Sequence, residues 1–476
     1  MRNIIDLARQ GFSLAERIRT IHLNAPRSSP SMNAEAKIPR SGWRKTCLST
    51  YPNSIALNPE TINSELFNWN RRRFMRHMRE DSIAVFFSND LVSSNGETHR
   101  RYRQHPDIYY LTGVTQAETV LVLAPKTAKQ GFEEVLFIRR PDTRAARLRG
   151  PGIDLQQAAQ LSGIQQVCFL DELDDHLHEL VLLASRIYIN SREDRHAYSE
   201  APARDLRFAE RLMRLYPAHK YHRAQPILKK IGMVKSAPEV GLIGAAVNLI
   251  HAGLQAGAGE IRPNQKEQEI EAAMHSAIIA GGAHGLAHPI RVASGSMSLY
   301  PEYDINSGSL EDERLVQLQL GVVYAGYNAS IARAFPVNGT FSEHQAKVYQ
   351  GVENCLYDGM KSLVPGSSLP ECERQLRNRL QEVLETLGYA AGHVGVHFPT
   401  ECYSHIGRNL RDPYEAYAPL QSGMVVTCAP AIYLPEENFG ILLRNVVLVT
   451  DEGPIDLTSS LPTSIEAIEE MIGVMA

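Results

Sequence analysis

The chain has 476 residues, of which 43% are hydrophobic and 21% are charged, a balance typical of a soluble globular protein with two or three domains. Its net charge of −4 is not that of a nucleic-acid-binding protein. The six cysteines show no CxxC spacing, which argues against a disulfide framework or a zinc knuckle. No run of about 18 apolar residues occurs, so we expect no membrane span.

Residues 1–57 have the composition of an extension rather than of a folded domain. Apolar residues alternate there with arginines, and a stretch rich in proline and serine follows. This composition is typical of a mitochondrial transit peptide, although Asp6 and Glu16 oppose that interpretation because such peptides contain few acidic residues. The alternatives are a disordered tail or a start codon placed too early. We therefore expect a protein of the mitochondrial matrix or of the cytoplasm.

Residues 58–224 have the pattern of a domain that combines helices with buried strands. Glu65–Met78 has helical periodicity, whereas Ser82–Phe87 is a short apolar run. Thr119–Ala124 and Val135–Ile138 are two further apolar or β-branched runs. Runs of this length and composition predict buried strands.

Residues 225–476 form the second predicted domain, in which amphipathic helices flank apolar strands. Its first helix begins with a capping box, because the side chains of Ser236 and Glu239 can each reach a free backbone amide. Further helices are predicted over Gln265–Ile279, after Ser342, and over Leu369–Leu387. Helices and paired strands on either side of a midpoint predict an α+β fold with a curved sheet.

The centre of this domain is the stretch Leu315–Gly339. Apolar runs at 315–320 and 331–335 flank a turn region rich in glycine and tyrosine. Such a pattern predicts a hairpin-like unit, which we expect Val337-Asn338-Gly339 to close.

Two runs resemble the aminopeptidase P family of Xaa-Pro aminopeptidases. Residues 102–113, YRQHPDIYYLTG, are similar to the family's YRQNSDFWYFTG, and Phe335–Gly339 repeats its FPVNG. The resemblance covers about 400 residues, from Asn58 almost to the end. It implies an N-terminal α/β domain of the aminopeptidase P type and a C-terminal pita-bread domain. It also implies a peptidase whose two manganese ions activate a shared hydroxide.

The resemblance places five metal-ligand positions in this chain, and four of them have lost their ligand. Gln319 and Ser330 stand where the family has aspartates, His397 matches its histidine, and Ala429 and Arg444 stand where it has glutamates. The side chains at these positions therefore change from about four negative charges to about one positive charge, with Arg444 repelling a dication. We expect no metal cofactor and no catalytic residues.

Positions that handle substrate in the family have also changed. The resemblance places Glu302, His393 and Ser404 at these positions. Glu302 and Arg444 are both charge substitutions, so one hypothesis is that they form a buried ion pair in place of the metals. His284, His288, His393 and His405 lack the spacing of a metal site, and we interpret them as ordinary polar groups of loops and strands.

Three functions are consistent with this pattern. The first is a catalytically inactive relative of Xaa-Pro aminopeptidase with a binding, structural or regulatory role. The second is a metal-independent hydrolase of the creatinase type, with Glu302, His397 and Arg444 as base, acid and anion clamp. The third is an active manganese-dependent aminopeptidase, if the alignment of the ligands is displaced. The resemblance also implies a homo-oligomer or a complex with other subunits, and a peptide or small-molecule ligand.

Overall fold

A computed structural model describes residues 64–92, 101–125, 131–142, 146–147, 150–191, 204–389, 398–399, 401–409, 411–412 and 417–475. The chain divides into two compact units between Met233 and Val234, which we call the N-terminal and C-terminal domains. From the sequence we expected this division between residues 224 and 225. Helix α9 (Gln225–Met233) belongs to the N-terminal domain because Leu228 and Ile231 join its core.

The N-terminal domain is built on a six-stranded mixed sheet with the order β4-β3-β2-β1-β5-β6. Strands β1 and β3 each pair antiparallel with β2, while the pairs β1–β5, β5–β6 and β3–β4 are parallel. The strands are β1 (Ser82–Phe87), β2 (Val120–Leu123), β3 (Glu134–Ile138), β4 (Gln166–Phe169), β5 (Arg186–Ile189) and β6 (Lys220–Arg223). The apolar runs expected near β1, β2 and β3 are thus strands.

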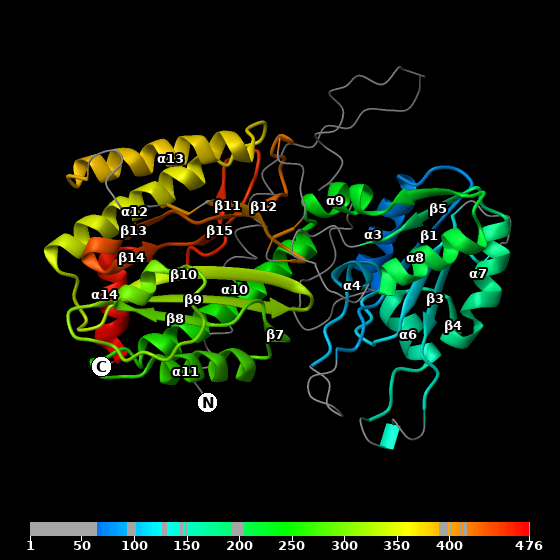
Figure 1. Ribbon diagram of the computed structural model, residues 1–476, viewed down its shortest axis with the longest axis horizontal. Helices are drawn as coiled ribbons and strands as arrows, with labels where there is room; N and C mark the ends of the chain where they lie inside the picture. The colour runs from blue at the N-terminus through cyan, green and yellow to red at the C-terminus, as the bar shows by residue number, and fades with distance from the viewer. Residues whose placement is uncertain are drawn as a thin grey trace, which may run out of the picture. The chain divides into compact units, whose positions relative to one another are not determined.

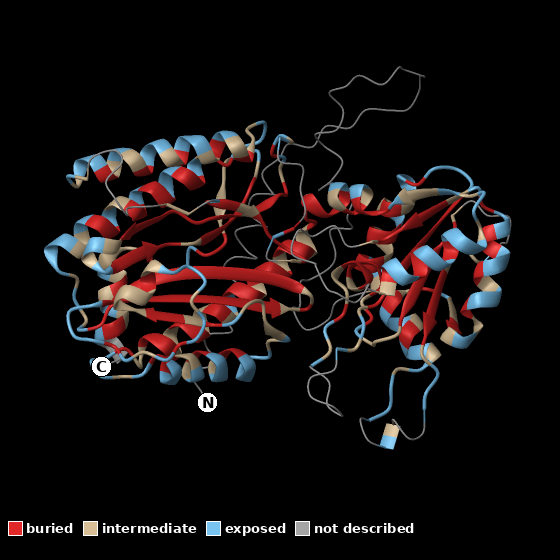
Figure 2. Ribbon diagram, viewed as in Figure 1, coloured by how far each residue is buried: buried red, intermediate tan, exposed pale blue. Residues whose placement is uncertain are grey.

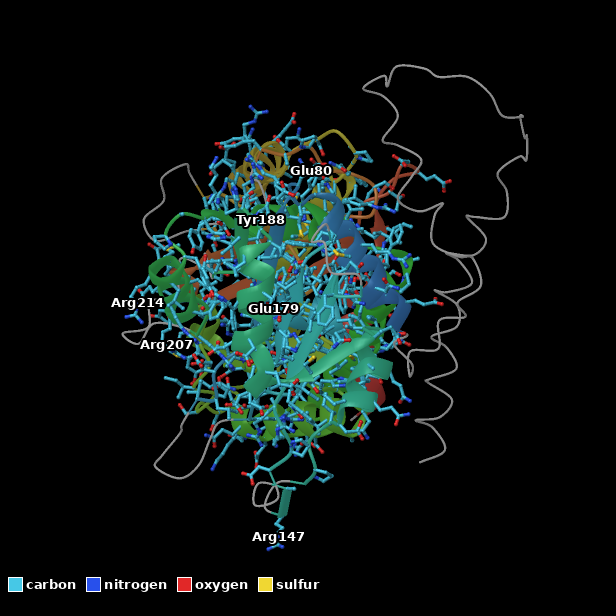
Figure 3. The ribbon with its side chains drawn as sticks, turned by 90° about the vertical axis from the view of Figure 1, so that its right-hand side faces the viewer. Glu80, Arg147, Glu179, Tyr188, Arg207 and Arg214 are labelled. Carbon is cyan, nitrogen blue, oxygen red and sulfur yellow. The ribbon has the colours of Figure 1, made fainter. Side chains whose placement is uncertain are left out.

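Helices cover both faces of this sheet because its strands are apolar on both sides. Ile83 and Val85 of β1 pack with α7 (Leu173–Leu182) and α8 (Arg204–Leu215). Ala84 and Phe86 pack on the other side, with α3 (Ser64–Arg76), α4 (Pro106–Thr112), α6 (Leu155–Ser162) and α9. Exposed Glu179 of α7 and Arg207 and Arg214 of α8 carry charge on the outer face (Figure 3). The domain is a three-layer α/β/α structure.

The C-terminal domain contains two four-stranded sheets and a hairpin (Figure 1). The first sheet joins β10 to β9, which also pairs with β7 and β8. The second has the order β11-β12-β15-β16, and β13 pairs with β14. These strands are β7 (Gly285–Leu286), β8 (Arg291–Ser294), β9 (Leu315–Tyr324), β10 (Tyr327–Pro336), β11 (Tyr403–His405), β12 (Val425–Cys428), β13 (Ala431–Leu434), β14 (Phe439–Leu442), β15 (Asn445–Leu448) and β16 (Ile455–Asp456).

Five α-helices of the described residues pack around these sheets, whose strands are largely buried (Figure 2). Helices α10 (Ala237–Ala258) and α11 (Glu267–Ala280) pack on each other, and α10 lies against β9 and β10. Helix α12 (Glu343–Lys361) contacts β12 and β13 and packs on α13 (Leu369–Thr386), while α14 (Ile465–Met475) contacts α10 and α12. Among the described helices, only α10 has the length and apolarity of a membrane span, but 56% of its apolar stretch is buried, as in a core helix.

The capping box expected at the start of α10 is present. The backbone amide and the hydroxyl of Ser236 donate to Glu239 Oε2 at 2.8 and 2.7 Å. Glu239 is buried, and its other carboxylate oxygen accepts from Tyr327 Oη at 3.0 Å. This carboxylate therefore anchors α10 to the central hairpin.

The central hairpin is longer than the sequence indicates. Strands β9 and β10 pair over ten residues each, from Leu315 opposite Pro336 to Tyr324 opposite Tyr327. The turn is Ala325-Gly326, with φ angles of 48° and 76°, which is the backbone geometry of a type I′ turn. The expectation that Val337-Asn338-Gly339 closes the hairpin was wrong, because these residues follow β10.

Arg333 of β10 fixes this hairpin to the neighbouring sheet. Its side chain is fully buried and donates to the carbonyl oxygens of Pro462, Ala332 and Arg444 at 2.5, 2.8 and 2.9 Å. It also donates to Asn445 Oδ1 at 2.8 Å and to Thr463 Oγ1 at 3.0 Å. A buried guanidinium is tolerated when its donors are satisfied in this way.

We predict that Arg333→Met lowers the free energy of unfolding by about 3 kcal/mol or more, because it leaves several buried acceptors without a donor. Urea-induced unfolding measures this change. Arg314→Met is the matched control, since Arg314 pairs with Glu311 on the surface of the same domain, and it should cost no more than about 0.5 kcal/mol. Equal costs for the two variants would contradict this role of Arg333.

Candidate functional site

Four residues lie side by side in a row across the C-terminal domain. Arg291 of β8 is the register partner of Gln319 of β9, which is opposite Ala332 of β10, and Ala332 bridges to Arg444. The Arg444 amide donates to the Ala332 carbonyl at 3.1 Å. Register partners project to the same side of a sheet, so the four side chains share one face. We call this set, together with Ser330 and His288, the arginine site.

Ser330 lies at the centre of a hydrogen-bond chain in the arginine site. It is two residues from Ala332 and therefore on the same face. Arg444 Nη1 donates to Ser330 Oγ at 3.1 Å, and Ser330 Oγ lies 3.1 Å from His288 Nε2. His288 Nδ1 lies 2.6 Å from the Pro289 carbonyl, which can only accept. Nδ1 therefore carries the proton, and Ser330 donates to Nε2.

Burial and neighbouring guanidinium groups determine the charges of His288 and Arg444 in this hydrogen-bond chain. The pKa of His288 is lowered to about 4, mainly by burial. The Pro289 carbonyl opposes this shift, and Arg444 and Arg291 add to it. Burial likewise lowers the pKa of Arg444 to about 10, with Tyr433 opposing and Arg291 adding to the effect. At neutral pH the imidazole is therefore uncharged, while Arg444 stays a cation.

Gly321 lets His288 approach the hairpin. Gly321 is the register partner of Ser330. A Cβ atom at Gly321 would lie 2.8 Å from His288 Cδ2 and 2.9 Å from His288 Nε2. Any side chain at this position would therefore displace the imidazole from Ser330.

Gln319 and Arg291 both hold the loop that follows β8. Gln319 Nε2 donates to the Pro301 carbonyl at 2.9 Å, and Arg291 Nη1 donates to the same oxygen at 3.2 Å. The buried atoms Gln319 Oε1 and Arg291 Nε have no hydrogen-bond partner among the described residues. The row therefore contains one acceptor and one donor that the described part of the chain does not satisfy.

Ala429 lies in apolar surroundings. It belongs to a buried cluster with Ala332, Ala431, Tyr433 and Leu442. Its amide donates to the Cys402 carbonyl at 2.8 Å. Its methyl group can neither coordinate a metal ion nor form a hydrogen bond with the Ser330 hydroxyl or the Arg444 guanidinium.

The three expected substrate-handling positions have different outcomes. Ser404 Oγ lies 2.8 Å from Thr427 Oγ1, its register partner on β12. Glu302 is exposed, and among the described residues it forms no ion pair with Arg444. The hypothesis of a buried Glu302–Arg444 pair was therefore wrong, because Glu302 lies at the surface. His393 and His397 lie outside the described residues.

The role of His288 was not predicted from the sequence. We interpreted this residue as an ordinary loop histidine, but the structure brings it to Ser330, 42 residues away. No local spacing signals such a contact. Among the described residues, Cys168, Glu172 and His176 of the N-terminal domain have ligand atoms close enough to one another to hold a metal ion.

We predict that Gly321→Ala lowers the free energy of unfolding by about 1–3 kcal/mol, because the new methyl group overpacks against His288. Urea-induced unfolding measures the cost, and the nitrogen chemical shifts of His288 report whether its Nδ1–H tautomer persists. The control is Gly473→Ala in α14, where no atom lies within 4 Å of the new Cβ. A variant at Gly321 as stable as that control would disprove the close approach.

Models of two protein families match the chain. The Metallopeptidase family M24 model covers residues 241–451, and the model named Aminopeptidase P, N-terminal domain, covers residues 67–188. Together they span most of the described part of both domains. The order of the two matches is the order of domains that the sequence analysis expected.

Curated relatives match over most of their length. The Xaa-Pro aminopeptidase of Escherichia coli is 26% identical over 86% of this chain and 98% of its own length. Human Xaa-Pro aminopeptidase 3 is 24% identical over 82% of this chain and 81% of its own. The mitochondrial intermediate cleaving peptidase 55 of Arabidopsis thaliana is 22% identical over 89% and 86%.

Solved structures show the same fold. A putative aminopeptidase P from Bacillus anthracis superposes with a TM-score of 0.82 at 24% identity, over 87% of this chain and 99% of that one. Aminopeptidase PepP of Pseudomonas aeruginosa gives 0.80 at 23% identity over the same shares. The expected fold class is thereby confirmed, and the chain belongs to the aminopeptidase P family, with that family's N-terminal domain followed by a pita-bread domain.

Proposed function

We propose that this protein is a catalytically inactive relative of Xaa-Pro aminopeptidase that acts by binding rather than by hydrolysis. The observation that carries the proposal is the hydrogen bond from Arg444 Nη1 to Ser330 Oγ, at 3.1 Å. The family resemblance assigns carboxylate metal ligands to both of these positions. A cationic side chain thus contacts the residue that would otherwise help to hold a metal.

The charge of Arg444 supports the absence of a metal pair. Two unit charges about 4 Å apart interact by about 4 kcal/mol at an effective dielectric constant near 20, and a dication doubles this repulsion. Hard divalent cations also need several oxygen ligands, preferably charged. An amide, a hydroxyl, a methyl group and a guanidinium do not fit that need, so no hydrolytic step is assigned to metals here.

The other positions support the same proposal. Gln319 donates its amide nitrogen to Pro301, and Ala429 lies in an apolar cluster. Glu302 is exposed, and among the described residues it forms no ion pair with Arg444. These contacts serve packing and local hydrogen bonding.

A metal-independent hydrolase is the second candidate, and the contact between Ser330 Oγ and His288 Nε2 at 3.1 Å favours it. A serine beside an imidazole is the arrangement of a nucleophile and its general base. Burial lowers the pKa of His288 to about 4, however, and a base this weak is poorly matched to neutral pH. Binding therefore stays the preferred function.

The location and assembly of the protein are part of the proposal. The name of the Arabidopsis thaliana relative places that protein in mitochondria, and the arginine-containing residues 1–57 support the mitochondrial matrix over the cytoplasm. We propose a homo-oligomer, or a complex with other subunits. Microscopy of a fluorescent fusion and sedimentation of the purified protein would test these two points.

Elemental analysis and an Xaa-Pro peptidase assay test the proposal together. The protein is purified without chelator, its manganese content is measured, and turnover is assayed with added manganese, with Escherichia coli Xaa-Pro aminopeptidase as the positive control. We expect no stoichiometric manganese and no turnover. A Cys168→Ser variant identifies any zinc held by the Cys168 cluster. Two manganese ions per chain with peptide cleavage would overturn the proposal, whereas cleavage without metal that Ser330→Ala abolishes would favour the second candidate.

A further inference from the structure

We propose that Arg291 and Arg444 together bind a small oxyanion, a carboxylate or a phosphate, in the C-terminal domain. This inference rests on the proposed function, because the anion uses the face on which the family resemblance places the metal ligands. It identifies the chemical class of the ligand that the inactive site would take.

Two positive charges share the site, and no described carboxylate pairs with either of them. Arg291 and Arg444 are both half-buried, and among the described residues neither forms an ion pair with a carboxylate. Arg291 is close enough to lower the pKa of both Arg444 and His288. Two like charges in a half-buried site repel each other. A bound anion would attract both guanidinium groups and so offset this repulsion.

Most other arginines of the same domain have a carboxylate partner or a full set of hydrogen-bond acceptors, unlike Arg291 and Arg444. Five of them pair with carboxylates: Arg262 with Glu260, Arg314 with Glu311, Arg377 with Glu373, Arg379 with Glu382 and Asp358, and Arg411 with Glu401. The buried Arg333 has instead a full set of carbonyl, amide and hydroxyl acceptors. Arg291 and Arg444 have neither compensation.

Both guanidinium groups have donors that remain available. Each guanidinium has five N–H groups, but Arg444 donates in the described structure to Ser330 and Arg291 to Pro301. Arg291 Nε is buried and has no partner among the described residues. An unsatisfied buried donor costs about 1–3 kcal/mol. Carboxylates and phosphates match the planar fork of a guanidinium and accept two hydrogen bonds from it.

The geometry of the row also favours one ligand shared by the two arginines. Arg291 and Arg444 stand at its two ends, separated by Gln319 and Ala332. Three steps between strands of about 4.8 Å each separate their backbones by about 14 Å. Two extended arginine side chains can reach toward each other over this span, past Gln319 and past Ala332, which packs against Tyr433 and Ala429. The row therefore suits an anion of a few atoms.

Gln319 adds a preference for the shape of the ligand. It is 2% exposed, and its Oε1 atom is an acceptor without a partner in the part of the chain that the structure describes. A ligand that carries a hydrogen-bond donor beside its oxyanion would satisfy this atom. Hydroxycarboxylates and hydrogen phosphate have such a donor, whereas acetate does not.

Calorimetric titration of the full-length protein with sodium phosphate, sodium lactate and sodium acetate, at constant ionic strength set with sodium chloride, tests the inference. We expect saturable binding of phosphate or lactate and weaker binding of acetate. Binding of phosphate alone assigns a phosphate ligand, and binding of lactate alone assigns a carboxylate, so either result supports the site. No saturable binding of any of the three anions would overturn the inference.

Matched variants locate the binding. We expect R291Q/R444Q to lose about tenfold or more in affinity, and R314Q, which removes a surface arginine of the same domain, to bind as the wild type does. R291Q alone is measured too, in case the double variant fails to fold, and should lose at least about fivefold. Wild-type affinity in folded R291Q would overturn the assignment.

The outcome is separable from that of the proposed function. Absence of anion binding together with absence of manganese and turnover would reject the oxyanion ligand and leave the inactive peptidase in place. Manganese-dependent turnover would reject the inactive peptidase and, with it, the anion site.

Discussion

The pairing of β9 with β10 is the constraint on which the C-terminal domain depends. Ten residues of each strand are in register, and a shift by one residue would exchange the two faces of the hairpin. The register places Gln319, Ser330 and Ala332 on one face. On β10, Arg333 alternates with these residues and binds the Arg444 carbonyl and Asn445. The backbone of Arg444 is thereby held beside the hairpin, and its side chain reaches Ser330.

Under the proposed function, this arrangement explains how the family's fold is kept while the charge of the site changes. The contacts that hold the strands together are backbone pairs and the buried Arg333, and none of them needs a metal. The positions that the resemblance assigns to metal ligands are therefore free to change. With Arg444 and Arg291 present, the face attracts anions instead of cations. The two positive charges therefore support ligand binding more directly than hydrolysis.

The sequence predicts those features that depend on neighbouring residues. The strand Ser82–Phe87 and the capping box of Ser236 and Glu239 are local patterns, and both occur as expected. The contact of His288 with Ser330 was not predictable, because it requires a glycine at position 321 on the adjacent strand. The Glu302–Arg444 pair was predicted from opposite charges alone. Burial decides such pairs, and sequence spacing does not indicate the exposure of Glu302.

An anomalous difference map at the manganese absorption edge, from crystals soaked in a manganese salt, tests the replacement of the metal pair by Arg444 most directly. We predict no manganese peak within coordination distance of Gln319 or Ser330, and the Arg444 guanidinium still bonded to Ser330. Two manganese peaks beside these residues, with Arg444 turned away, would contradict it.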